Sequence, residues 1–114
     1  MRYFGLLALA LAGVAAPAVA ADQNGYQAIV SGDLATAERA IVAEQKLYPD
    51  RPELMLNLAA VYRRTGRTAE ARTLYMRVLE RRPIAMDLPS GAVASSHDLA
   101  RRALGTNSVQ IATR

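Results

Sequence analysis

Residues 50–83 read DRPELMLNLAAVYRRTGRTAEARTLYMRVLERRP, and this stretch decides the fold. Asp50 and Glu53, with a proline between them, are typical of a capped helix start. Gly66 is expected to end this helix, because glycine tolerates the left-handed conformation beyond a helix end. Thr68 is expected to cap a second helix. The spacing therefore predicts two helices joined by a turn of about three residues.

Each of the two helices carries one apolar face. The apolar residues recur at helical spacing: Met55, Leu58, Ala59 and Tyr62 in the first helix, and Ala71, Leu74, Tyr75, Val78 and Leu79 in the second, which Pro83 stops. Ala59 and Ala71 are small where two such helices would cross, which permits close packing. We therefore expect an antiparallel helix pair with its turn at residues 65–67.

The same pattern occurs once before, 34 residues earlier. Several residue types recur at this interval: Gly32 and Gly66, Ala35 and Ala69, Ala37 and Ala71, and Pro49 and Pro83. The first unit is predicted to hold a short helix over 22–31 and a second helix over 34–47, with Asp33 as a cap. Its first helix is less regular, because Ala21, Asn24 and Ala28 stand where large apolar residues are expected.

On these residues the chain resembles the tetratricopeptide repeat (TPR) family. The second unit carries the family signature at Met55, Leu58, Ala59, Tyr62, Ala71, Tyr75, Val78 and Pro83. The resemblance covers residues 21–83 and implies an all-α fold of about two antiparallel helix pairs. It also implies a non-enzymatic protein–protein interaction module, which binds a peptide or a helix in a groove lined by the first helices of its repeats.

The groove implied by this resemblance is formed by a second face of the two first helices, rotated by about 100° from the core face. The candidate partner-binding residues are Gln23, Tyr26, Val30, Glu53, Leu56, Asn57, Ala60 and Arg64. Tyr26 and Leu56 are expected to be exposed among polar neighbours, which suits peptide capture. Some TPR proteins bind carboxylates with basic and Asn side chains, and here Asp22, Tyr26, Leu56 and Ala60 fill corresponding positions, so that clamp is expected to be absent.

The first 20 residues are predicted to be a signal peptide. Residues 3–21 carry no charge, and Ala18 and Ala20 supply the small side chains that signal peptidase requires, so cleavage is expected after Ala20. Cleavage after Ala21 and retention as an N-terminal membrane anchor are the alternatives. This segment predicts a periplasmic or secreted protein, and the Ala- and Arg-rich composition points to a Gram-negative bacterium.

The C-terminal third leaves the 34-residue period. Ile84, Met86 and Leu88 alternate with other residues before a Pro-Ser-Gly turn, so residues 84–94 are interpreted as a candidate β-hairpin. Ser95 is expected to cap a short helix that ends at Gly105, and residues 106–114 are expected to be a flexible tail. This short helix is expected to serve as the capping helix of the repeats.

Composition and motifs argue against several classes of function. The 114 residues include 14 basic and 10 acidic side chains, one His and no Cys, which excludes disulfides and thiol chemistry and leaves too few ligands for structural zinc. Ser96, His97 and Asp98 are consecutive and cannot converge as a triad. No catalytic, cofactor-binding or metal-binding residue is therefore assigned, and a small hydrolase using His97 stays a remote alternative.

The basic residues favour helix capping rather than nucleic-acid binding. Lys46, Arg63, Arg64, Arg81, Arg82, Arg101 and Arg102 all lie near predicted helix C-termini, where the helix dipole stabilises cations. The expected partner is therefore a protein or a peptide, and no membrane span is expected after signal cleavage.

The small number of repeats predicts that the protein associates. Ile41, Leu54 and Val61 present apolar faces that a chain with fewer than two good repeats is expected to leave uncovered. A second copy or a partner helix would cover them. A self-associating accessory protein of the periplasm is therefore the alternative function.

Overall fold

The structure, a computed structural model, describes residues 25–112, with side chains up to residue 105. Most of these residues are helical. The helices are α2 (Tyr26–Ser31), α3 (Leu34–Leu47), α4 (Pro52–Arg64), α5 (Thr68–Glu80) and α6 (Ser96–Ala112), and the strands are β1 (Ala85–Asp87) and β2 (Val93–Ser95). Within these residues, no helix combines the length and the apolar character needed to cross a bilayer.

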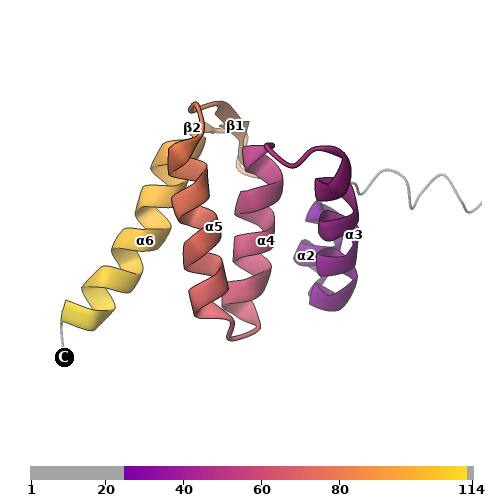
Figure 1. The fold of residues 1–114 in the computed structure, drawn as a ribbon, viewed down its shortest axis with the longest axis horizontal. Coiled ribbons are helices and arrows are strands. Elements are labelled where there is room, and N and C mark those ends of the chain that lie inside the picture. Colours follow the sequence, from indigo (N-terminus) through magenta and orange to yellow (C-terminus); the bar gives the residue numbers. More distant parts are fainter. Residues whose placement is uncertain (1–24, 113–114) are drawn as a thin grey trace, which may run out of the picture.

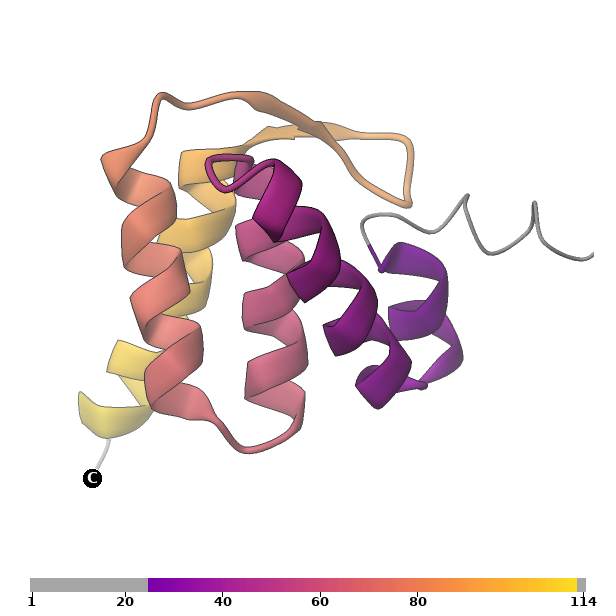
Figure 2. The ribbon, with the colours of Figure 1, turned by 45° about the vertical axis from the view of Figure 1, so that its right-hand side comes forward.

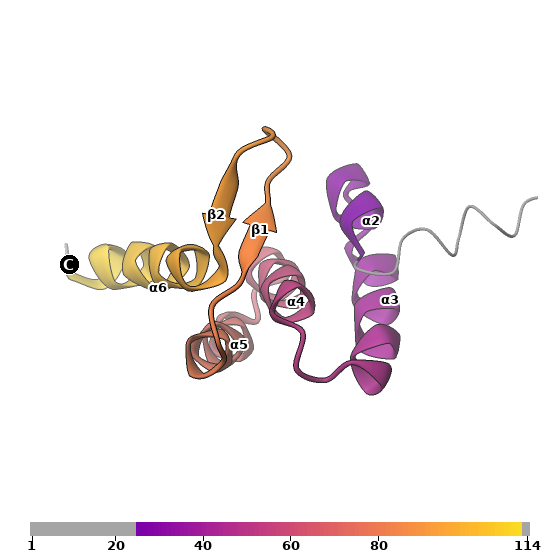
Figure 3. The same ribbon diagram turned by 90° about the horizontal axis from the view of Figure 1, so that it is seen from above.

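The helices stand in a row, each beside the next one along the chain (Figure 1). The two strands form an antiparallel hairpin between α5 and α6, and this hairpin arches over one end of the row and reaches toward the start of α2 (Figure 2). Seen from above, β1 lies on the side of α2 and α4, whereas β2 lies on the side of α6 (Figure 3). The fold is therefore mostly helical, with one small sheet.

The α4–α5 pair forms the centre of the core. Its turn occupies the residues between Arg64 and Thr68, as predicted, and Gly66 adopts a left-handed φ of 82° there. Ala59 and Ala71 are completely buried, which confirms that small residues lie where the helices pack closely.

Two of the predicted helix caps are wrong. Neither α4 nor α5 has a side-chain cap, and their N-cap residues are Arg51 and Arg67. The Asp50 carboxylate instead accepts hydrogen bonds from the Arg81 guanidinium, with an Nη2–Oδ1 distance of 2.9 Å. Thr68 is already inside α5 as its first residue. The Asp50 carboxylate, which the local spacing predicted to cap α4, therefore pairs with Arg81 at the C-terminal end of α5.

The first helix pair follows the prediction more closely. Helix α3 has the expected bounds, and the Asp33 side chain caps it by accepting a hydrogen bond from the Thr36 N–H at 3.2 Å. Helix α2 begins at Tyr26 rather than at residue 22, because Gly25 adopts a φ of 73° immediately before it. Residues 22–24 lie outside the described residues.

The C-terminal segment forms the expected hairpin but a longer helix. Met86 pairs with Ala94 in the hairpin register, and Ser95 caps α6 by accepting a hydrogen bond from the His97 N–H at 3.2 Å. The expected helix end at Gly105 is wrong, since α6 continues to Ala112. Gly105 is not among the glycines with a positive φ, so it does not form the left-handed turn that would end a helix.

The apolar faces expected to need a partner are covered within one chain. Ile41 and Val61 are completely buried, and Leu54 is 1% exposed. Helix α3 packs against α4 and covers these residues, while α6 packs against α4 and α5 from the other side. The premise for obligatory association is therefore wrong, because the packing of α3 on α4 closes the end of the second helix pair that was expected to stay open.

An ion pair joins the first helix pair to the second. The Arg67 guanidinium donates hydrogen bonds to both carboxylate oxygens of Glu38, one of them at 3.0 Å, and it also stacks over the Tyr62 ring. These hydrogen bonds hold the pKa of Glu38 below its ordinary value of 4.5 and raise the pKa of Arg67. The α3–α5 contact is thus strongest when Glu38 is ionised.

We predict that Glu38→Gln flattens the acid end of the stability profile. Because the pKa of Glu38 is lowered in the folded state, its contribution is fully present above about pH 4.5 and is lost as the pH falls through the folded pKa. The variant should melt below the wild type at pH 7 and approach it at pH 3. The measurement is the melting temperature by circular dichroism across this range.

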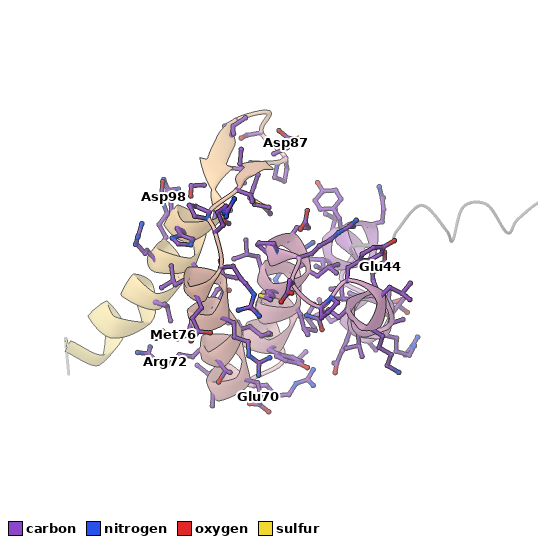
Figure 4. All side chains as sticks on the ribbon, turned by 45° about the horizontal axis from the view of Figure 1, so that its top comes forward. Glu44, Glu70, Arg72, Met76, Asp87 and Asp98 are labelled. Atoms are coloured by element: carbon purple, nitrogen blue, oxygen red, sulfur yellow. The ribbon has the colours of Figure 1, made fainter. Side chains whose placement is uncertain are left out.

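Glu44→Gln is the matched control, since Glu44 projects from the same helix (Figure 4) and forms no ion pair within the described residues. The control should keep the wild-type pH dependence. Parallel melting curves for Glu38→Gln and the wild type would contradict the assigned role of the ion pair.

Candidate functional site

A hollow of about 550 Å³ lies between α2, α4 and the hairpin, on the face toward which the hairpin projects. Seven of the eight predicted groove residues line it: Tyr26, Val30, Glu53, Leu56, Asn57, Ala60 and Arg64. Gln23, the eighth, lies outside the described residues. Residues that are up to 38 positions apart in sequence are thus brought to one site by the side-by-side placement of α2 and α4.

The hairpin provides a wall that the sequence did not assign to the groove. The additional lining residues are Ile29 from α2, Met86, Asp87, Leu88 and Pro89 from the hairpin, and Leu99 from α6. The alternation through Ile84, Met86 and Leu88 did indicate a strand with one apolar face. It gave no indication of which helices this face would meet.

Burial divides the hollow into a floor and two more open walls. Leu56 is only 9% exposed, so the expectation that it would be exposed is wrong: α6 and the hairpin cover it from one side. Tyr26 and Val30 on α2 are 40% and 66% exposed. An occupant would therefore rest on Leu56 and Ala60 and would cover the apolar surface of α2.

The charged lining residues lie at opposite ends of the groove. Glu53 stands in the first turn of α4 and Arg64 in its last turn, so about 16 Å of helix separates them at 1.5 Å per residue. Asp87, on the hairpin (Figure 4), lines the same hollow as Glu53. The Arg64 guanidinium donates a hydrogen bond to the Ile29 carbonyl at 3.3 Å, which joins α4 to α2. One end of the groove is thus acidic and the other is basic.

The edge of β1 beside α2 exposes backbone hydrogen-bonding groups. In the hairpin, the Ser96 N–H donates to the Ile84 carbonyl and the Leu88 N–H donates to the Ala92 carbonyl. Hydrogen-bonded residues alternate in an antiparallel ladder, so Ala85 and Asp87 direct their N–H and C=O groups away from β2. Within the described residues, these groups have no hydrogen-bond partner.

Ser96, His97 and Asp98 make separate contacts outside the groove. Ser96 is completely buried, and its Oγ accepts a hydrogen bond from the Ile84 N–H at 3.0 Å. The His97 ring is 2.7 Å from the Arg81 carbonyl and donates to it in the tautomer with a proton on Nε2. Asp98 pairs with Arg101 one turn along α6. The three side chains therefore fasten the start of α6 and do not point toward one another.

The described residues contain no group of three or more His, Asp or Glu side chains placed to hold a metal ion. Comparison of the chain with protein-family models, curated proteins and solved structures finds no match. The function is therefore inferred from the geometry of the groove.

Proposed function

We propose that this chain is a TPR-like, non-enzymatic interaction module of the bacterial cell envelope, which holds an extended peptide segment of a protein partner in the groove. The repeat assignment is supported by the 34-residue interval between the starts of α3 and α5, at Leu34 and Thr68. Gly32 and Gly66, also 34 residues apart, adopt nearly the same φ, 85° and 82°. Equivalent residues therefore occupy equivalent turns.

The observation that carries the proposal is that one hollow is lined by seven of the eight residues that the sequence predicts for the groove. The lining is mostly apolar, and the exposed side chains of Tyr26 and Val30 give a partner surface to bury. Concave, largely apolar sites with a few polar groups are typical of ligand-binding sites.

An extended segment fits the groove better than a helix. The outward N–H and C=O groups of Ala85 and Asp87 can pair with a third strand, as in peptide recognition by strand addition. Alternate side chains of such a strand would point toward the apolar floor. The proposed partner segment therefore carries apolar residues at every second position.

The opposite charges at the two ends of the groove favour one orientation of the bound segment. A basic side chain of the partner is favoured beside Glu53 and Asp87, and an acidic one beside Arg64. The uncharged residues 3–21, which include Ala18 and Ala20, support export, and the proposed partner is therefore sought in the cell envelope.

The experiment compares Val30→Lys with Val93→Lys. The two valines are 66% and 65% exposed, but Val30 lines the groove and Val93 does not. Affinity-tagged wild type and both variants are used to capture envelope proteins, which are quantified by mass spectrometry. We expect Val30→Lys to lose its partner by about tenfold or more, equivalent to about 1.4 kcal/mol, because a cation replaces apolar contact area. Val93→Lys should bind as the wild type does.

Equal capture by the three proteins, or no specific capture by any of them, would contradict the groove as a binding site. Capture of untagged copies of the same chain, lost only in Val30→Lys, would favour the self-associating alternative. Circular dichroism of both variants checks that the helices are retained.

A further inference from the structure

Two hollows beside the groove, on the side of α4 that faces α6, share a tyrosine and an arginine. One hollow, of about 330 Å³, is lined by Arg63, Tyr75 and Arg102 together with apolar residues. The other, of about 420 Å³, is lined by Ala60, Arg63, Arg64 and Tyr75. No acidic residue lines either hollow. Three exposed arginines and one tyrosine therefore border two open, adjoining hollows, each much larger than the roughly 30 Å³ that one water occupies.

Tyr75 is the unusual member of this cluster. It is only 5% exposed, yet its hydroxyl has no hydrogen-bond partner within the described residues. A buried phenolic O–H normally finds a partner, because leaving it unpaired carries a desolvation penalty. Since Tyr75 lines both hollows, a molecule that occupied either of them could supply this partner.

The position of Arg102 is not explained by helix stability. The sequence placed Arg102 near a helix C-terminus, where the dipole would favour a cation. Helix α6 instead runs to Ala112, which leaves Arg102 in the interior of the helix. Arg63 has no ion pair within the described residues, so no carboxylate of the described chain neutralises it. Arg63 thus lines both hollows without a counter-charge from their lining.

We propose that Tyr75, Arg63, Arg64 and Arg102 bind the phosphoryl group of a small soluble phosphate, either inorganic phosphate or a phosphate monoester. The planar guanidinium donates pairs of hydrogen bonds that match the oxygens of a phosphoryl group, and the Tyr75 hydroxyl adds a neutral donor. Three cations suit a dianion better than the single charge of a carboxylate. This site borders the groove and shares with it the residues Leu56, Ala60, Arg64 and Leu99.

The test is titration of the full chain with sodium phosphate at constant ionic strength, followed by calorimetry and by melting temperature. We expect saturable binding in the low millimolar range or tighter, and a melting temperature that rises with phosphate concentration. Tyr75→Phe removes one hydroxyl and should weaken binding about 5–10-fold, whereas Arg63→Gln should weaken it about tenfold or more. In phosphate-free buffer, Tyr75→Phe should melt at the wild-type temperature or above, because an unpaired buried hydroxyl is removed.

Two variants serve as matched controls. Tyr62→Phe removes a phenol that lines neither hollow, and Arg72→Gln removes the same charge from the exposed side of α5 (Figure 4). Both should bind phosphate as the wild type does. If Arg63→Gln and Arg72→Gln weakened phosphate binding equally, general electrostatic attraction would explain the binding, and the proposed site would be contradicted. Absence of saturable binding would overturn it as well.

Glycerol 3-phosphate in a parallel titration distinguishes the two sources of the phosphoryl group. Tighter binding of the monoester, with the same loss in Tyr75→Phe, identifies a phosphorylated small molecule as the ligand. Tighter binding of inorganic phosphate identifies the free ion. Acetate that binds as tightly as phosphate would contradict selection of a dianion.

Discussion

Ala71→Arg will unfold the protein. Ala71 is completely buried where α5 packs closely against α4, so a long cationic side chain there must either clash or lie buried without a counter-charge. Burying an unpaired charge costs about 3–5 kcal/mol, and overpacking adds about 1–3 kcal/mol. Domains of this kind are stable by only about 5–15 kcal/mol, so most of the stability is lost. Circular dichroism at 222 nm, a standard helix signal, checks the result during heating.

Ala69→Arg is the control for this substitution. Ala69 lies on the same helix two residues earlier and is exposed. The same residue change, with the same change in charge and helix propensity, should leave the melting temperature within a few degrees of the wild type. An Ala71→Arg protein that melts like the Ala69→Arg protein would contradict the close packing of α4 and α5.

Gly25→Ala will destabilise the first helix pair. Gly25 has a φ of 73°, and a Cβ atom there would lie 2.7 Å from both Cγ1 and Cδ1 of Ile41. Ile41 is completely buried, so its side chain can shift only by displacing its neighbours in the packed core. Backbone strain of about 1 kcal/mol and overpacking of about 1–3 kcal/mol together predict that the free energy of unfolding falls by about 2–4 kcal/mol. Chemical denaturation measures this loss as a lower transition midpoint.

Gly32→Ala separates the two causes. Gly32 has a φ of 85°, but a Cβ atom at this position would meet nothing within 4 Å. The Gly32→Ala control therefore has the backbone strain without a steric clash, and its free energy of unfolding should fall by only about 1 kcal/mol. Equal losses in the two variants would show that Ile41 is not held against α2.

The helices could be predicted where local pattern and repeat period agree. Helix α3 and the turn around Gly66 follow from residues close in sequence, and the structure has them as predicted. The Asp50 cap failed because the competing partner, Arg81, lies 31 residues away and only folding brings it near. Gly105 failed for a related reason: glycine permits a helix end but does not impose one.

The site was predictable on its helical side and not on its hairpin side. Rotation about a helix axis assigns Glu53, Asn57 and Arg64 to one face without knowledge of the fold. Met86 and Leu88 join that face only because the hairpin leans toward α2, a direction set by tertiary packing. The burial of Leu56 depends on the same packing and was missed with it.

The row of helices, each packed on its neighbour in the chain, also has a kinetic consequence. Most contacts close short loops, and the hydrogen bonds between Ile84 and Ser96 join residues only 12 apart. Low contact order of this kind is associated with rapid folding, since little chain entropy is lost before contacts form. In such a linear array, α2 and α3 lie at one end and touch few other elements, so they can open while α4, α5 and α6 stay folded. The wall of the groove that carries Tyr26 and Val30 thus belongs to the element of the array that unfolds at the lowest free-energy cost.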